Sequence, residues 1–201
     1  MNTILISAQA SIGSFVRRFK PGIWYLTIIG FINSAGFSLS LPYIALYLNQ
    51  NRSISMIAVG LIILLTGLIS AAVQLASGAL CDRLGRRPLL IASLVSGTVL
   101  FGWMALLIEV TAPVWAIIVV YTGLRGAIVM ANPAIQSMVV DHCPRERLTE
   151  AYGLVRIGGN LGWALGPALG GFLLASLHYS WLFGVATLMR GIALIFALIH
   201  R

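Results

Sequence analysis

Two long uncharged stretches separated by a short basic segment constrain the fold of this chain more than any other feature. Residues 56–80 and 89–108 contain no Asp, Glu, Lys or Arg. Each stretch is long enough to cross about 30 Å of bilayer hydrocarbon as a helix. The segment between them, residues 78–88, contains Asp82, Arg83, Arg86 and Arg87. We therefore expect two membrane-spanning helices joined by a tight turn at the membrane surface.

The composition extends this expectation to the whole chain. Of the 201 residues, 59% are apolar and 9% are charged, and the mean hydropathy is +0.97. A soluble domain of this size would lack the polar surface to cover itself. We expect a lead-in at residues 1–22 and six spans, at residues 23–48, 55–80, 88–108, 114–140, 151–177 and 181–199. The predicted fold class is an all-α, polytopic membrane protein.

The net charge of +8 does not indicate nucleic-acid binding, because the Lys and Arg residues lie at the ends of apolar runs. Lipid headgroups are their expected partners. Loops rich in Arg alternate with loops whose only basic residue is Arg52, so the positive-inside rule predicts that both termini are cytoplasmic, in the cytoplasmic (inner) membrane. Cys81 and Cys143 fall in predicted cytoplasmic loops, where we expect free thiols.

The basic segment has a defined order of residue types. Its constrained positions are Gly78, Asp82, Arg83, Gly85, Arg86 and Arg87. This order resembles Gly-x-Leu-x-Asp-Arg-x-Gly-Arg-Arg, the loop between helices 2 and 3 of major facilitator superfamily transporters. The resemblance implies the amino-terminal six-helix half of such a transporter, built from two inverted three-helix repeats, with a second six-helix half as its partner.

The same resemblance assigns a role to three charges. In the superfamily the matching Asp and Arg form a cluster with an acid at the end of span four, and the cluster latches the outward-facing state. The corresponding residues here are Asp82, Arg86 and Asp141. An alternative that stays open is that these residues only satisfy positive-inside topology.

A glycine pattern in the fifth predicted span is the second strong signal. It consists of Gly153, Gly162, Gly166, Pro167, Gly170 and Gly171. The pattern resembles the antiporter signature of the drug:proton antiporter branch. Small residues every four positions let two membrane helices pack closely, and Pro167 permits a bend. The helix is thus expected to rock against a neighbour, although a static packing motif is also consistent with the pattern.

Polar residues also form stripes along three predicted spans. The stripes are Asn33, Phe37 and Ser40 in span one, Thr122, Arg125, Asn132 and Gln136 in span four, and Arg156, Asn160 and Trp163 in span five. Polar groups inside a bilayer usually face a cavity or the protein interior. We expect the stripes to wall one water-filled substrate cavity, while hydrogen bonds between helices remain the alternative for the Asn, Ser and Gln residues.

Arg125 and Arg190 lie near the predicted midplane, where an Arg costs about 2.5–3.5 kcal/mol. We assign both to the substrate cavity. No acid lies in the middle of a predicted span. The compensating negative charge is therefore expected from an anionic substrate, from backbone carbonyls, or from a part of the protein outside this chain.

The sequence does not favour an enzyme. His142, His178 and His200 all fall at span ends, and no His, Cys or acid residues stand at metal-ligand spacing within a span, so we expect no cofactor and no metal. The resemblance implies a secondary transporter of small molecules working by alternating access, with proton-coupled drug efflux as its activity. Two alternatives are a carrier of anionic metabolites and a transport-inactive half-molecule or assembly module.

Overall fold

The computed structural model describes residues 19–199, so most of the predicted lead-in, together with His200 and Arg201, lies outside the described residues. The described chain is helical and contains no strand. Its elements are α2 (Pro21–Gln50), α3 (Met56–Leu84), α4 (Arg86–Glu109), α5 (Val114–Val129), α6 (Ala131–His142), the 3₁₀ turn η1 (Arg145–Arg147), α7 (Leu148–Leu174) and α8 (Tyr179–Ile199). The all-α prediction is confirmed.

Within the described chain, five segments are long and apolar enough to cross a membrane. They are Pro21–Gln50, Met56–Leu84, Arg86–Glu109, Val114–His142 and Tyr179–Ile199. The remaining long helix, α7, is absent from this set, because its many glycines together with Arg156 and Asn160 lower its hydropathy. The division of residues 23–201 into six spans stays a prediction.

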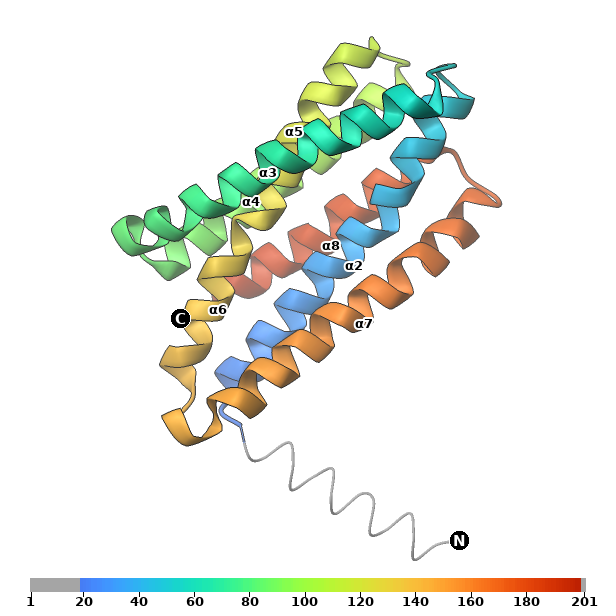
Figure 1. Cartoon of the computed structure of the whole chain (residues 1–201). Helices are drawn as coiled ribbons and strands as arrows, with labels where there is room; N and C mark the ends of the chain where they lie inside the picture. The colour runs from blue at the N-terminus through green and yellow to red at the C-terminus, as the bar shows by residue number, and fades with distance from the viewer. Residues whose placement is uncertain (1–18, 200–201) are drawn as a thin grey trace, which may run out of the picture.

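The helices form a bundle in which α2 packs along α7 on one side and against α8 on the other (Figure 1). α4 packs against α8 and α5, and α3 lies against α5. Two apolar cores fill the bundle. One includes Ile23, Leu89 and Ala134, and the other includes Phe101 and Phe183. We call the end of the bundle where α3 meets α4 and α6 leads into α7 the basic end.

The turn between α3 and α4 is shorter than the predicted hairpin at residues 78–88. α3 continues to Leu84, α4 starts at Arg86, and Gly85 alone lies between them with φ +91°. This left-handed backbone conformation strains any residue with a side chain, which explains the glycine. The Gly85 amide donates to the Cys81 carbonyl at 3.0 Å and closes α3.

The predicted fourth span, residues 114–140, consists of two helices. α5 ends at Val129, α6 begins at Ala131, and Met130 stands between them. Pro133 has no backbone N–H to donate to the carbonyl four residues earlier, which belongs to Val129. The lost hydrogen bond accounts for a break at this place, although Val114–His142 as a whole remains one membrane-length segment.

Candidate functional site

A cavity of about 540 Å³ opens between α2, α6 and α7, in the half of the bundle nearer the basic end. It is lined by Gly30, Asn33, Ser34, Asn132, Ile135, Gln136, Tyr152, Val155, Arg156 and Gly159. The three helices come together in Figure 1, where α6 descends toward the start of α7 beside α2. Tyr152 donates its hydroxyl to the Gln136 carbonyl at 3.1 Å and links α7 to α6.

Four residues from the predicted stripes meet in this cavity. Asn33 comes from α2, Asn132 and Gln136 from α6, and Arg156 from α7. Asn33 is buried, whereas Gln136 and Arg156 are exposed. No carboxylate is among the described lining residues, so this wall offers one guanidinium and three amides. Such a set can bind hydrogen-bond acceptors and negative charge.

Three further stripe residues lie outside the lining. Phe37 and Trp163 pack edge to face, with ring centroids 5.5 Å apart and an interplanar angle of 80°, and so join α2 to α7. Asn160 is exposed on α7. None of the three belongs to the residues that form the cavity wall.

Ser40, Thr122 and Arg125, which the stripes also assign to the substrate cavity, are not among the described residues that line this one. The Ser40 hydroxyl donates to carbonyls of its own helix, and the Thr122 hydroxyl donates to the Ile118 carbonyl at 2.7 Å. Such bonds satisfy a hydroxyl without a partner helix. Arg125 lies over the Tyr121 ring, 5.9 Å from its centroid, where a cation–π contact offsets part of its burial.

Arg190 also lies outside the cavity, because it is fully buried in the core between α2, α4 and α8. Its guanidinium donates to the Asn33 side-chain oxygen, to the Ser93 carbonyl at 2.8 Å and to the Ser93 hydroxyl at 3.5 Å. The Ser93 hydroxyl in turn donates to the Ala127 carbonyl at 2.6 Å. The expected negative partner of Arg190 is thus a backbone carbonyl together with an amide oxygen.

At the basic end, Arg86 forms an ion pair with Asp141 and donates to the Ser137 carbonyl at 3.1 Å. The contact joins the start of α4 to the end of α6. Asp82 is exposed, and its carboxylate forms no hydrogen bond or ion pair with another residue in 19–199. Two members of the predicted three-charge cluster therefore meet within this chain, and the third stands apart from direct contact.

The other constrained positions of the basic segment have different surroundings. Arg87 donates to the carbonyls of Ala197 and Leu198, both at 3.3 Å, and so ties α4 to the last turn of α8. The sequence did not predict this contact, because the resemblance assigns Arg87 to the loop motif and names no partner for it on the last span. Arg83 is exposed, and a Cβ added at Gly78 would meet no described atom within 4 Å. No other helix therefore approaches Gly78 closely within the described chain.

The glycines of α7 pack against the backbone of α2. The buried members are Gly158, Gly162, Gly166 and Gly170. A Cβ at Gly162 would lie 2.5 Å from the Phe31 carbonyl oxygen, closer than real Cβ contacts. Ser38 donates its hydroxyl to the Gly162 carbonyl at 2.9 Å, and Tyr43 donates to the Pro167 carbonyl at 2.6 Å. The small-residue ridge and its close helix packing are present, with α2 as the neighbour.

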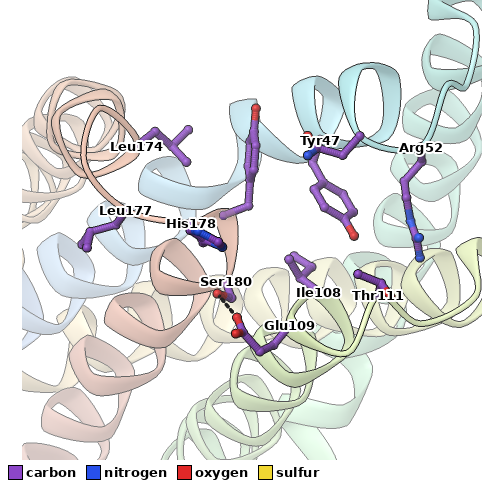
Figure 2. Close-up of a pocket in the computed structure, with 11 residues that line it drawn as sticks. Tyr47, Arg52, Ile108, Glu109, Thr111, Leu174, Leu177, His178 and Ser180 are labelled. Carbon is purple, nitrogen blue, oxygen red and sulfur yellow. Dashed lines mark hydrogen bonds between the residues drawn. The ribbon is translucent and has the colours of Figure 1, made fainter.

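A second cavity, of about 620 Å³, lies at the end opposite the basic end and was not predicted (Figure 2). Glu109 from the end of α4 accepts a hydrogen bond from the Ser180 hydroxyl of α8 at 2.6 Å. Tyr47 and Arg52 line another side of it, and Arg52 donates to the Ala112 carbonyl. The sequence feature that could have indicated this cavity is Glu109, the one acidic residue outside the predicted cytoplasmic loops.

No group of three or more His, Cys, Asp or Glu side chains among residues 19–199 is placed to hold a metal ion. Cys81, which is buried, and Cys143, which is partly buried, are both free thiols.

Comparisons with known proteins identify the family. A family model described as Major Facilitator Superfamily matches residues 26–201. Multidrug resistance protein MdtG of Yersinia enterocolitica is 29% identical over 157 residues, which is 74% of this chain and 36% of that protein. MdtG of Salmonella paratyphi C is 30% identical over 156 residues, 74% of this chain and 36% of its own.

An uncharacterized MFS-type transporter of Mycobacterium tuberculosis is 30% identical over 184 residues, which is 89% of this chain and 43% of that protein. The chain spans less than half the length of these curated relatives. The match over nearly all of the helical bundle, together with the apolar helices, shows that this chain belongs to the major facilitator superfamily of membrane transport proteins.

Proposed function

We propose that this chain forms one six-helix half of a secondary transporter that exports drugs or similar small molecules across the cytoplasmic membrane by alternating access. The cavity between α2, α6 and α7 carries the proposal. The consecutive helices α6 and α7 bring Gln136 and Arg156 to the same cavity as Asn33 of α2. Polar side chains inside spans are costly and usually mark a substrate path. Drugs are the proposed class of substrate because two of the relatives are named multidrug resistance proteins.

The proposal includes proton coupling, for which a transporter needs a group that takes up and releases protons. No carboxylate is among the described lining residues of the cavity. We place the proton-binding acid in the partner half, which would face this cavity across the substrate path.

The proposed latch is the charge cluster at the basic end. The ion pair of Arg86 with Asp141 links α4 to α6 across the turn between α3 and α4. Any state in which these helix ends separate must break that pair. Asp82 stands on the last turn of α3, four residues before Arg86, and contributes a second negative charge near the guanidinium.

The test is transport by the full-length protein, or by this chain paired with a second six-helix half, in proteoliposomes with an imposed pH gradient. We expect ethidium, a cationic dye, to move only while the gradient lasts. Gln136→Leu should slow this movement at least several-fold, because it removes an exposed amide from the cavity wall. Ser40→Ala is the matched control, since among residues 19–199 the Ser40 hydroxyl donates only to carbonyls of α2. Gradient-independent or absent ethidium movement would contradict the proposal.

Arg156 supports a second candidate, a carrier of organic anions. It is the one charged residue among the described lining residues. If anions are the substrates, the proteoliposomes should accumulate an aromatic carboxylate and not ethidium, and Arg156→Gln should abolish that accumulation. Counterflow by this chain alone would exclude the third alternative, a transport-inactive module.

A further inference from the structure

We propose that Arg190 is a positioning residue, which turns the Asn33 amide so that its NH₂ group faces the cavity between α2, α6 and α7. The cavity would therefore select ligands that present a hydrogen-bond acceptor at this point, such as a ketone, ether or carboxylate oxygen. The inference deepens the proposed function and rests on this cavity being the substrate site.

The geometry that carries the inference is the contact behind the cavity wall. Arg190 has no exposed surface, and one terminal nitrogen of its guanidinium donates to the Asn33 side-chain oxygen. The other terminal nitrogen donates to the Ser93 carbonyl at 2.8 Å. Asn33 belongs both to this buried cluster and to the lining of the cavity. It is thus the one described residue that links the buried charge directly to the ligand space.

The direction of the Asn33 amide follows from the donor and acceptor inventory. A guanidinium has five N–H donors and no acceptor, so only the oxygen of an amide can face it. The Asn33 NH₂ group must then point away from Arg190. The Asn33 NH₂ group forms no hydrogen bond with a described residue. The unpartnered side-chain nitrogens that are fully buried in the described chain belong to Arg52, Arg87 and Arg190, so the Asn33 nitrogen keeps some exposed surface. It is therefore left open on the cavity side.

The surroundings of Arg190 hold its guanidinium in this position. A Cβ added at Gly97 would clash with the guanidinium, so glycine provides the space that the group fills. The Ser93 hydroxyl is fixed by its bond to the Ala127 carbonyl. Bonding to an ionised donor also polarises the Asn33 amide and strengthens its N–H groups as donors to a ligand.

Three neutral probes of nearly equal size test the inference: benzophenone, an acceptor; diphenylamine, a donor; and diphenylmethane, which is neither. Binding to the full chain in lipid nanodiscs is measured by equilibrium dialysis, with empty nanodiscs as the correction for lipid partition. We expect benzophenone to bind about two- to twelve-fold more tightly than diphenylmethane, the range that one net hydrogen bond supplies. Diphenylamine should bind no more tightly than diphenylmethane.

Asn33→Asp is the sharpest variant, because it keeps the side-chain shape, pairs with Arg190 and replaces the NH₂ donor by an acceptor. The order of the probes should invert, with diphenylamine binding most tightly. Arg190→Met frees the Asn33 amide to turn either way, so the ratio of benzophenone to diphenylamine affinity should fall to within about twofold. Ser40→Ala should keep the wild-type order, since Ser40 is buried on α2 away from the cavity lining.

Equal wild-type affinities for benzophenone and diphenylmethane, or no binding above empty nanodiscs, would overturn the inference. It would also fail if Asn33→Asp kept the wild-type order, or if a folded Arg190→Met variant kept the full ratio. Folding is checked by far-UV circular dichroism and size-exclusion chromatography, and Asn33→Asp decides the matter if Arg190→Met does not fold. Transport in proteoliposomes is measured independently, so its absence with an intact probe order would reject the proposed function alone.

Discussion

The packing of α7 on α2 leads to a quantitative prediction for Gly166→Ala. A Cβ at this position would lie 2.7 Å from the Leu39 amide nitrogen and 2.9 Å from the Ser38 carbonyl carbon. Both atoms belong to the backbone of α2 and cannot rotate away as a side chain can. The two helices must therefore separate, and the hydrogen bond from Ser38 to the Gly162 carbonyl must lengthen or break.

The magnitude follows from three contributions. Overpacking costs about 1–3 kcal/mol, and loss of hydrogen bonds between membrane helices costs roughly 0.6 kcal/mol each. Two such bonds, from Ser38 and Tyr43 to carbonyls of α7, are at risk. Replacing glycine by alanine in a helix stabilises the folded state by about 1 kcal/mol, which offsets part of this cost. We expect the free energy of unfolding to fall by about 1–3 kcal/mol.

The assay is unfolding of the full chain in mild detergent by added sodium dodecyl sulfate, followed by circular dichroism. Gly153→Ala is the matched control, because it lies on the same helix and its Cβ would meet no described atom within 4 Å. The control gains the same helix propensity without a clash, so its stability should stay level or rise by up to about 1 kcal/mol. A Gly166→Ala variant as stable as Gly153→Ala would refute the close-packing argument.

Three further predictions concern the basic end. Asp141→Asn breaks an exposed ion pair, so the free energy of unfolding should change by less than about 1 kcal/mol. Transport by the full-length protein should nevertheless fall several-fold, and an unchanged transport rate would argue against the latch. Asp82→Asn should reduce transport while expression stays nearly normal, as measured by uptake per amount of immunoblotted protein. Full transport by this variant would count against a role for Asp82 in the latch. A membrane-impermeant maleimide should label Cys143 in inside-out vesicles and not in intact cells. In a cysteine-free background, the same reagent should label Ser176→Cys in intact cells and not in inside-out vesicles.

The helical elements were predictable because a bilayer leaves an uncharged chain segment few other structures. The limits of the basic turn were not. The sequence predicts a loop at Asp82 and Arg83, yet both residues continue α3. Charged residues are acceptable helix formers, and at a membrane surface their side chains reach water without ending the helix. Only Gly85, with its positive φ, ends α3.

The break in the fourth predicted span was not predicted, although Pro133 was visible. An apolar segment of membrane length that contains a proline is predicted as one kinked helix, because hydropathy does not show which backbone hydrogen bonds are kept. In the structure Met130 separates α5 from α6, four residues after Gly126, whose carbonyl accepts from the Met130 amide at 3.2 Å.

The cavity was predictable only in part. Helical periodicity identifies side chains that share a face, and two of the residues that it groups, Asn132 and Gln136, line the same cavity. It does not identify the neighbour that the face meets, nor whether a hydroxyl is already satisfied by its own helix. Ser40 and Thr122 fit their stripes by spacing, but both donate to carbonyls of their own helices. Their polarity therefore gives no information about a cavity.

Arg190 shows why an apparently unpaired charge in a span is a weak argument for an anionic ligand. The cost of about 2.5–3.5 kcal/mol for an Arg at the bilayer centre can be met by hydrogen bonds to neutral acceptors, since a bond to a charged group contributes about 1.5–3 kcal/mol. Arg190 has two strong acceptors of this kind, the Asn33 amide oxygen and the Ser93 carbonyl. Both lie on other helices, 157 and 97 residues away in sequence, where spacing along the chain carries no signal. Arg190 is fully buried and both of its terminal nitrogens already donate hydrogen bonds, so it can act on a ligand in the cavity only through a group that it holds, and here that group is Asn33.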